Sequence, residues 1–424
     1  RLTLENDIDV FLIPSIWPET FSYTTEEIMK MGMPVMCFDI GAPAERVKKY
    51  EKGIIIPKIS VTSVYETITR NQVIKECCNK KINTQKILFV VQEVTFSSRY
   101  RIDHLREQLI RKGISSDCVS IKDVKKCNLK QYNSVVAYRI SDFDKLKRLK
   151  KKVQKLNKNI FYDIDDYIFN YEDIKDIGFL KGKEYRNYEN YTKLIKNCMT
   201  LCDGYIVSTL NLKKVIEEQF PGKMVVINRN VASMEMTIAS LTVDKVEKDY
   251  ITLGYFSGTK THNDDFESIK EELLDIMRKD VNVHLLIGGQ IELPVEFNEV
   301  KDQIETFKFV AWQDLPQLIA KADINLMPLE NMKFHECKSE NKWMEAALVN
   351  VPTIASWNNE LATVIKDGVD GFLCKNSEEW TNKLQQLVKN ENLRKQIAHD
   401  AHERVMKEYM TDDMEMEVFK TIVG

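Results

Sequence analysis

The sequence lacks the long apolar run of about 20 residues that a membrane-spanning helix requires, and it shows no signal peptide. Its nine cysteines have no metal-ligand spacing. Two of them, Cys77 and Cys78, are adjacent, which suits neither an ordinary disulfide nor a zinc knuckle. These absences predict a reduced, cytoplasmic protein. The chain begins with Arg1 rather than methionine, and it reads as a piece of a longer polypeptide.

A strong excess of one charge is also missing. The formal net charge of -3 gives no general attraction to nucleic acid or to acidic surfaces. No G-x-G-x-x-G motif follows an expected strand, which argues against a dinucleotide-dependent dehydrogenase. Hydrophobic residues at 43% and charged residues at 29% are ordinary proportions for a soluble protein. At roughly 100–200 residues per domain, the length predicts two to four domains.

An internal repeat organises the chain. The segment DIDVFLIPSIWPETFSYTTEEIMKMGMPVMCFDIGAPAE near the start returns as ADINLMPLENMKFHECKSENKWMEAALVNVPTIASWNNE downstream. Three pairs of residues share one offset of 318 positions: Glu27 and Glu345, Pro34 and Pro352, and Gly53 and Gly371. Before the helix the offset is 314, as Asp9 and Asp323 show, so the second copy has a longer loop. Each copy predicts a strand, loop, helix and strand of a doubly wound parallel sheet.

The repeat divides the chain into three regions. Residues 1–81 hold one repeat unit without the partner strands that would precede it, so we expect a partial domain. Residues 86–235 hold five strand-like runs and predict a complete Rossmann-like domain; these runs cover 86–91, 134–138, 159–162, 204–208 and 225–228. Residues 250–424 predict a second such domain that ends in charged helices. The stretch 236–249 between them reads as a linker.

Several segments resemble one enzyme family. PETFSYTTEEIMKMGMPV resembles the E-x7-E signature of family-four GT-B glycosyltransferases, with Glu19 and Glu27 at the two glutamate positions. GYFSGTKTHNDDF, FHECKSENKWMEAALVNVPTIAS, DIDDYIF and CDGYIVST are similar to bacterial enzymes of the same group. The resemblance implies a GT-B fold, with two Rossmann-like domains facing a cleft, and a retaining reaction without metal. One position departs from the signature, because Cys337 stands eight residues before Glu345 and Glu336 lies one residue away.

The KSENKWMEAAL segment carries the predicted donor site. Lys338, Lys342 and Glu345 stand at helical spacing and share one face. We expect free amides near Lys338 and Ser339 to hold a diphosphate, with Lys338 stabilising its charge as it leaves and the Ser339 hydroxyl donating. The resemblance implies that Glu345 binds the ribose hydroxyls of the donor. The alternative is a solvated helix face with an internal ion pair.

The GYFSGTKTH loop is the second predicted donor element. Gly258 lets backbone approach a ligand closely, and Thr259 follows it. Lys260 is a candidate for the phosphates, with a catalytic role in stabilising the leaving group, and His262 for the sugar or phosphate edge. A surface loop is the alternative. Gly288 and Gly289 end another strand and suit either a ligand contact or a tight turn.

The 86–235 domain contributes further candidates. The SSRYR segment (97–101) suits either a contact with the acceptor or the donor phosphate across the cleft, or a helix N-cap with flanking basic residues. His104 follows one turn later and is a candidate base, with a structural histidine as the alternative. Asp163, in the sequence DIDD, suits an acceptor-binding or base role, a structural turn, or a magnesium ligand together with Asp165. The resemblance argues against the metal.

A basic segment, 145–158, has apolar residues on one side and lysines on the other. It predicts either an ordinary Rossmann helix or a peripheral contact with the inner face of the membrane, useful for a lipid-linked acceptor. Taken together, the sequence predicts a glycosyltransferase in polysaccharide biosynthesis at the cell envelope. A nucleotide-sugar would be its co-substrate, with no other cofactor and no nucleic-acid partner, and a glycan, lipid-linked or cell-surface polysaccharide would be the acceptor. The alternatives are a nucleotide-sugar epimerase and a noncatalytic sugar-binding or partner-binding module.

Overall fold

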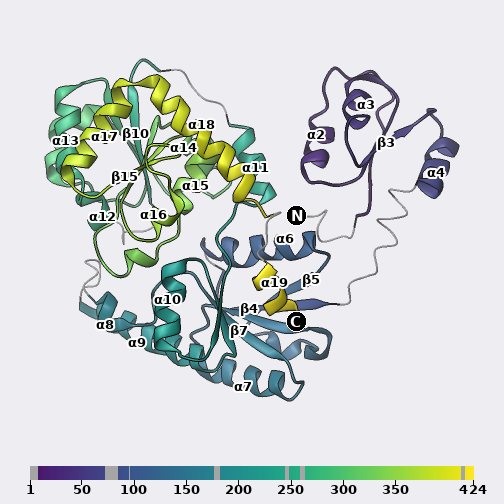
Figure 1. Cartoon of the computed structure of the whole chain (residues 1–424), viewed down its shortest axis with the longest axis horizontal. Coiled ribbons are helices and arrows are strands. Elements are labelled where there is room, and N and C mark those ends of the chain that lie inside the picture. Colours follow the sequence, from purple (N-terminus) through teal and green to yellow (C-terminus); the bar gives the residue numbers. More distant parts are fainter. Residues whose placement is uncertain are drawn as a thin grey trace. The chain divides into compact units, whose positions relative to one another are not determined.

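The structure is a computed structural model that describes residues 8–71, 85–94, 96–175, 182–243, 248–257, 263–411 and 416–424. It divides into two compact units, Arg1–Thr84 and Gln85–Gly424 (Figure 1). The second unit contains two six-stranded parallel sheets. No helix in the described ranges is both long and apolar enough to cross a membrane.

The first unit is a three-stranded parallel sheet in the order β1-β2-β3. Its elements are β1 (Phe11–Ile13), α2 (Tyr23–Lys30), β2 (Val35–Phe38), α3 (Gly41–Val47), β3 (Gly53–Ile56) and α4 (Val61–Arg70). The Ser22 hydroxyl caps α2 by accepting from the Thr25 amide. Gly41 has a φ of +64°, and a Cβ there would lie 2.8 Å from the Glu19 backbone, so only glycine fits this turn.

The first sheet of the second unit has the strand order β5-β4-β6-β7-β8-β9. Its strands are β4 (Lys86–Val91), β5 (Ser115–Ser120), β6 (Ser134–Tyr138), β7 (Asn159–Ile164), β8 (Gly204–Val207) and β9 (Met224–Ile227). Its helices are η1 (Arg99–Asp103), α6 (His104–Arg111), η2 (Val124–Lys126), η3 (Leu129–Gln131), α7 (Phe143–Gln154), α8 (Tyr171–Ile174), α9 (Gly182–Thr200), α10 (Leu210–Gln219) and α11 (Met234–Leu241).

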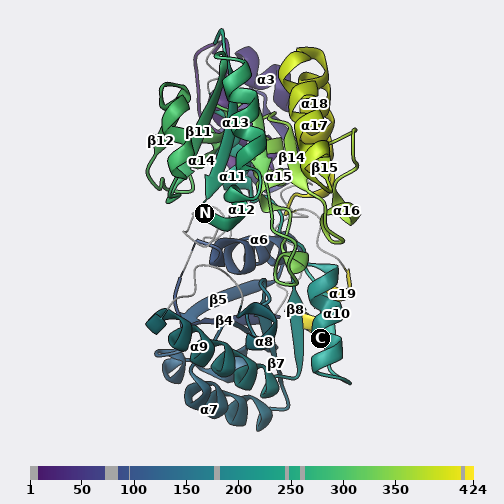
Figure 2. The same cartoon turned by 90° about the vertical axis from the view of Figure 1, so that its left-hand side faces the viewer.

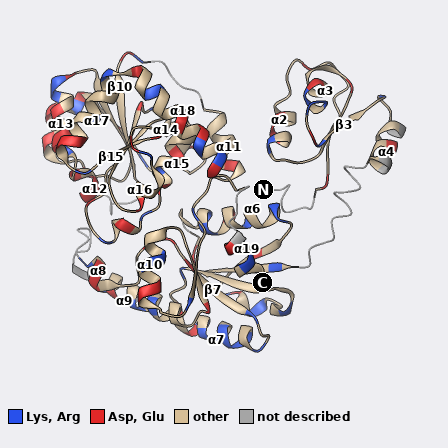
Figure 3. Ribbon diagram, viewed as in Figure 1, with Lys and Arg blue, Asp and Glu red and all other residues tan. Residues whose placement is uncertain are grey.

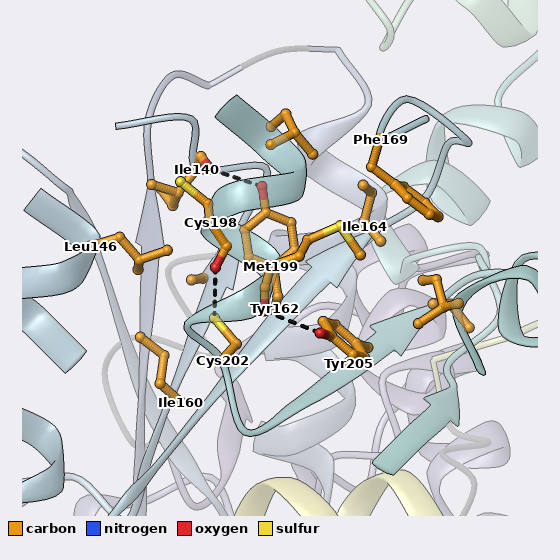
Figure 4. Close-up of a cluster of buried hydrophobic side chains, with 14 of the residues drawn as sticks. Ile140, Leu146, Ile160, Tyr162, Ile164, Phe169, Cys198, Met199, Cys202 and Tyr205 are labelled. Carbon is orange, nitrogen blue, oxygen red and sulfur yellow. Dashed lines mark hydrogen bonds between the residues drawn. The ribbon is translucent and has the colours of Figure 1, made fainter. Parts of the chain in front are cut away.

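Buried tyrosines in this domain keep their hydroxyl groups hydrogen-bonded. Tyr162 on β7 donates to the Ile140 carbonyl at 2.8 Å, and Tyr205 on β8 donates to the Met199 carbonyl at 3.1 Å (Figure 4). Both rings are fully buried among aliphatic side chains of the sheet and of α9. The rings can therefore be buried without leaving a polar atom unpaired in the core.

The second sheet has the order β12-β11-β10-β13-β14-β15. Its strands are β10 (Ile251–Ser257), β11 (Val283–Gly289), β12 (Ile304–Phe307), β13 (Ile324–Met327), β14 (Thr353–Ser356) and β15 (Phe372–Cys374). The remaining helices are α12 (Asn263–Glu267), α13 (Lys270–Lys279), η5 (Val295–Gln303), α14 (Leu315–Ile319), η6 (His335–Cys337), α15 (Asn341–Leu348), α16 (Leu361–Val364), α17 (Ser377–Lys389), α18 (Glu391–Glu408) and α19 (Met416–Val423).

The two sheets confirm the predicted pair of Rossmann-like domains (Figure 2). Two details differ from the sequence prediction. The α11 helix reaches Leu241, inside the stretch 236–249 that was predicted as a linker. The last helix, α19, was assigned to the 250–424 domain, but Val418 and Ile422 pack against β4 and β6 of the first sheet. The chain therefore returns to the first domain at its end, because the apolar side of α19 covers that sheet.

Candidate functional site

A cavity of about 680 Å³ lies between the two Rossmann-like domains, at the carboxyl ends of both sheets. Segments that follow β4, β6 and β7 line one side, and the ends of β10 and β11 with the segment after β12 line the other. The region from Phe334 to Glu345 closes it. Ligands of doubly wound sheets bind at this edge, so the cavity is the candidate functional site.

Three of the predicted donor residues line this cavity: Lys338, Lys342 and Glu345. Ser339 does not line it among the described residues, because its hydroxyl accepts from Asn230 Nδ2 at 3.2 Å. The predicted loop residues Gly258, Thr259, Lys260 and His262 lie outside the described residues. The structure thus brings together the α15 part of the predicted site and leaves the loop as a prediction.

Lys338 stands before α15 rather than on it. The backbone at Lys338 is extended, and the helix begins at Asn341, so the prediction that Lys338 and Ser339 form its first turn is wrong. The Lys338 Nζ forms an ion pair with Asp166 Oδ1 at 2.9 Å, across the cavity. The free amides of the helix start therefore belong to the residues from Asn341 onward.

Lys342 on α15 carries a buried amine. Its Nζ has no hydrogen-bond partner among the described residues and lies 4.5 Å from the centre of the Tyr255 ring. Burial lowers the pKa of Lys342 to about 8, against the opposite influence of Asp265. A cationic amine without a hydrogen-bond partner among the described residues, in the wall of a cavity, is suited to an anionic ligand.

Glu345 is held from the opposite domain. Its Oε1 accepts from Arg99 Nη2 at 2.6 Å and from the Tyr100 hydroxyl at 2.5 Å. Arg99 and Tyr100 belong to the SSRYR segment, which was predicted to reach across the cleft or to start a helix. Arg99 opens η1 and pairs with Glu345 of the second domain, while a contact of this segment with a ligand stays a prediction.

The aspartates of the DIDD segment are paired with arginines. Asp163 is fully buried and binds Arg101 at 2.8 Å, and burial raises the pKa of Asp163 to about 6 in spite of this partner. Arg139 pairs with both Asp165 and Asp166. Burial acts to raise the pKa of Asp166, but Lys338 and Arg139 outweigh it and hold that pKa well below the usual range.

The ion pairs bear on the two predicted roles of Asp163, acceptor binding and general base. Asp163 is in ion-pair contact with Arg101 and does not line the cavity among the described residues, which does not fit an acceptor-binding or base role. Asp166, which was not singled out, is the aspartate that reaches the cavity. Arg139 has a φ of +43°, a strained backbone for a non-glycine residue, and its side chain fixes Asp166 there.

His104 does not fit the predicted base. Its ring is buried, stacks edge-on against Tyr100, and has Nδ1 at 2.6 Å from the Val231 carbonyl. Burial lowers the pKa of His104 to about 3, so the ring is neutral at ordinary pH. It lies outside the cavity lining described above, and a packing role explains it.

Gly288 and Gly289 line the cavity at the end of β11. Gly289 has a φ of +111°, and a Cβ there would lie 1.6 Å from the Ser257 carbonyl oxygen of β10. Any side chain would push the two strand ends apart. The glycines therefore allow a close approach of the two strand ends at the cavity, and a contact with a ligand there stays a prediction.

Two parallel Rossmann-like sheets with a cavity between their carboxyl ends define the GT-B fold. Residues 251–390 match a family model described as "Glycosyl transferases group 1", and residues 3–76 match a second model with the same description. The chain therefore belongs to the group 1 glycosyltransferases of the GT-B fold. Residues 3–76 of the same chain form the C-terminal part of a second such module. Comparison with curated protein sequences gives no match.

Solved structures share the fold at low sequence identity. Anabaena Alr3699/HepE in complex with UDP is 13% identical, with a TM-score of 0.56, over 80% of this chain and 99% of that chain. A Rickettsia africae glycosyltransferase is 13% identical, with a TM-score of 0.57, over 80% and 99%. Sucrose-phosphate synthase from Thermosynechococcus elongatus is 12% identical, with a TM-score of 0.55, over 80% and 98%.

Proposed function

We propose that the unit Gln85–Gly424 transfers a sugar from a nucleoside-diphosphate-sugar donor, and that the donor binds against α15. The observation that carries this proposal is the Lys342 amine, which lies in the cavity wall and has no hydrogen-bond partner in the part of the chain that the structure describes. The HepE structures in complex with UDP and with UDP-glucose support a uridine nucleotide as the first donor to test.

Three sets of groups in the cavity contact different parts of the donor. Lys342 and the free amides at the start of α15 face the diphosphate, where the helix dipole also favours negative charge. Lys338 adds a second positive charge, which stabilises the nucleoside diphosphate as the glycosidic bond breaks. Glu345 is an acceptor when ionised and takes the ribose hydroxyls. These groups support a reaction without metal, and Lys260 remains a predicted third cation.

The acceptor side of the cavity is richer in aromatic residues. Tyr188 and Tyr191 on α9 line it together with Ile168 and the paired Asp166. Aromatic faces and carboxylates suit the apolar faces and hydroxyl groups of a sugar ring. We therefore propose a glycan or a lipid-linked sugar as acceptor, in the synthesis of a cell-surface polysaccharide. We further propose retention of the anomeric configuration, following the family resemblance.

A membrane-surface location is a separate proposal that rests on α7. Leu146, Leu149 and Val153 on this helix pack into the core. Lys147, Lys151 and Lys152 are exposed, and Figure 3 shows the basic residues along α7 in blue. Replacing Lys147, Lys151 and Lys152 with glutamate should abolish binding to vesicles that contain anionic lipid. Equal vesicle binding before and after the replacement rejects this location.

One incubation series tests the proposed function. The protein is mixed with UDP-glucose alone and with a panel of p-nitrophenyl glycosides, and the products are separated by chromatography. Transfer predicts the release of UDP together with an extended glycoside. The transferred sugar should keep the anomeric configuration that it had in the donor. A changed nucleotide-sugar without UDP release indicates an epimerase instead, and UDP-glucose binding without any product indicates a noncatalytic module.

A further inference from the structure

One contact between the two domains at the cavity joins three residues. Arg99 and Tyr100 follow β4 in the first domain, and Glu345 lies on α15 in the second. Both donors meet a single oxygen, Glu345 Oε1, at 2.6 Å and 2.5 Å. The Tyr100 hydroxyl also accepts from Arg99 Nη2 at 2.9 Å, so the three groups form a closed triangle. We call these three residues the clasp.

The surroundings of Arg99 hold its guanidinium in place. Its side chain is only 7% exposed. Aromatic rings surround it, with Phe96 at 4.1 Å and Tyr100 at 4.6 Å from the same domain and Trp312 at 5.3 Å from the other. Such stacking suits the planar, delocalised charge of arginine and fixes its orientation. Arg99 also begins η1, a turn of π-helix, which is a rare conformation that is frequent at functional sites.

The clasp leaves one side of the carboxylate available. Among the described residues, no side chain donates a hydrogen bond to Glu345 Oε2, while Oε1 receives both donors. Glu345 also lines the cavity. An ionised carboxylate accepts at both oxygens, so Oε2 keeps its full capacity for hydroxyl groups of a ligand.

We propose that Arg99 and Tyr100 are positioning residues for the donor: they hold Glu345 so that Oε2 meets the ribose hydroxyls. This inference rests on the proposed function of Glu345. It means that Arg99 and Tyr100 of the acceptor-side domain contribute to donor affinity through Glu345. Donor binding and closure of the cleft are therefore coupled, because the carboxylate is correctly oriented only when both domains meet.

The opposite arrangement is a latch. In a latch, Arg99 and Tyr100 would compete with the ribose for Glu345, and removing them would tighten donor binding. The single-oxygen geometry favours the positioning role, because the ligand and the clasp use different oxygens. The two arrangements predict opposite signs for the same substitution.

The test is calorimetric titration of UDP into the full chain and its variants. Tyr100→Phe removes one hydroxyl and keeps the ring, so it preserves the packing against His104. Tyr132→Phe is the matched control, because the Tyr132 hydroxyl also donates to a carboxylate, Asp117, at 2.5 Å, away from the cavity lining. Arg99→Ala and Arg99→Lys separate the loss of charge from the loss of the planar group.

Tyr100→Phe should weaken UDP binding about tenfold, and Arg99→Ala about 10- to 100-fold, as expected for hydrogen bonds to a charged group. Tyr132→Phe should leave the UDP affinity unchanged. Arg99→Lys should weaken UDP binding less than Arg99→Ala does. In the Glu345→Gln background, Tyr100→Phe should change the affinity less than about twofold, since the effect passes through the carboxylate. A merely structural role of Tyr100 would persist in that background.

Two kinds of failure are distinguishable. If Glu345→Gln weakens UDP binding but Tyr100→Phe and Arg99→Ala leave it unchanged or tighten it, the positioning role is overturned and the proposed function stands. If the wild-type chain binds no UDP, or if Glu345→Gln has no effect, the ribose role of Glu345 is wrong and the positioning role is rejected with it.

Discussion

The two copies of the repeat have the same strand order but different surroundings. The strands β1, β2 and β3 of the first copy correspond to β13, β14 and β15 of the second, and both sets are parallel in that order. The second copy continues a six-stranded sheet, whereas the first forms a sheet of only three strands among the described residues. In the first copy Trp17 is 76% exposed and Tyr23 is 77% exposed, while Trp343 on α15 is fully buried.

The corresponding glutamates show what this difference means. Glu27 on α2 is exposed to solvent, and Glu345 on α15 is clasped by Arg99 and Tyr100. The first copy keeps the E-x7-E pattern with Glu19, and the second has Cys337 at that position. The better motif is thus on the copy without a facing domain in its own unit. We therefore expect donor binding at the second copy, where the facing domain completes a cavity.

The largest effect should come from Lys338. Replacing it with alanine removes charge stabilisation from the leaving diphosphate and should lower kcat roughly 100- to 1,000-fold. As a control, Lys30→Ala on the helix of the first copy should leave kcat unchanged, because Lys30 is exposed and pairs only with its neighbour Glu26 among the described residues. Steady-state kinetics with UDP-glucose measure both, and wild-type turnover in Lys338→Ala would exclude the proposed site.

The glutamate pair gives the next effect. Glu345→Ala should raise KM for UDP-glucose about 10- to 100-fold, because the ribose hydroxyls lose a charged acceptor. Its counterpart, Glu27→Ala, should not change KM. Equal effects of the two substitutions would mean that the first copy also binds donor.

Lys342→Met should separate stability from binding. The substitution removes a buried amine that has no partner among the described residues, so it should stabilise the unliganded protein by about 1–3 kcal/mol. It should also reduce the increase in Tm that UDP produces. Thermal unfolding with and without UDP measures both changes. A less stable variant with an unchanged UDP response would show that Lys342 is only a packing residue.

The smallest effect concerns pH. The pKa of Lys342 is lowered from 10.5 to about 8 in the folded protein, so the unfolded chain binds more protons between these values. This group therefore makes the unliganded protein more stable as pH rises from about 8 to 10.5. UDP affinity should fall over the same interval, as the amine loses its charge. Titrations at several pH values should show this fall in the wild type and not in Lys342→Met.

Much of the fold was predictable from the sequence because buried parallel strands are continuous apolar runs. The predicted strand 86–91 coincides with β4, and 134–138 coincides with β6. The strand β5 was missed, because its sequence SSDCVS is polar and lies at the edge of the sheet. The return of α19 to the first sheet was also missed, since the helix pattern shows an apolar side but not which domain it covers.

The site was only partly predictable, because a local pattern shows which residues share a helix but not which distant segments they contact. Helical spacing correctly placed Lys342 and Glu345 at one cavity, because both lie on α15. It failed for Lys338 and Ser339, where the extended backbone before Asn341 breaks the helical period. The contact of Arg99 with Glu345 joins residues 246 positions apart in the sequence, and nothing local indicates it. Only the polar segment after β4 marked that region.

The stoichiometry of UDP binding to the full chain tests the central claim most directly. In the described residues, the second copy has a facing domain in its unit and the first copy has none. We therefore expect one UDP per chain, with the same affinity when the unit Gln85–Gly424 is titrated alone. Two equal sites, or loss of binding when residues 1–84 are removed, would contradict it.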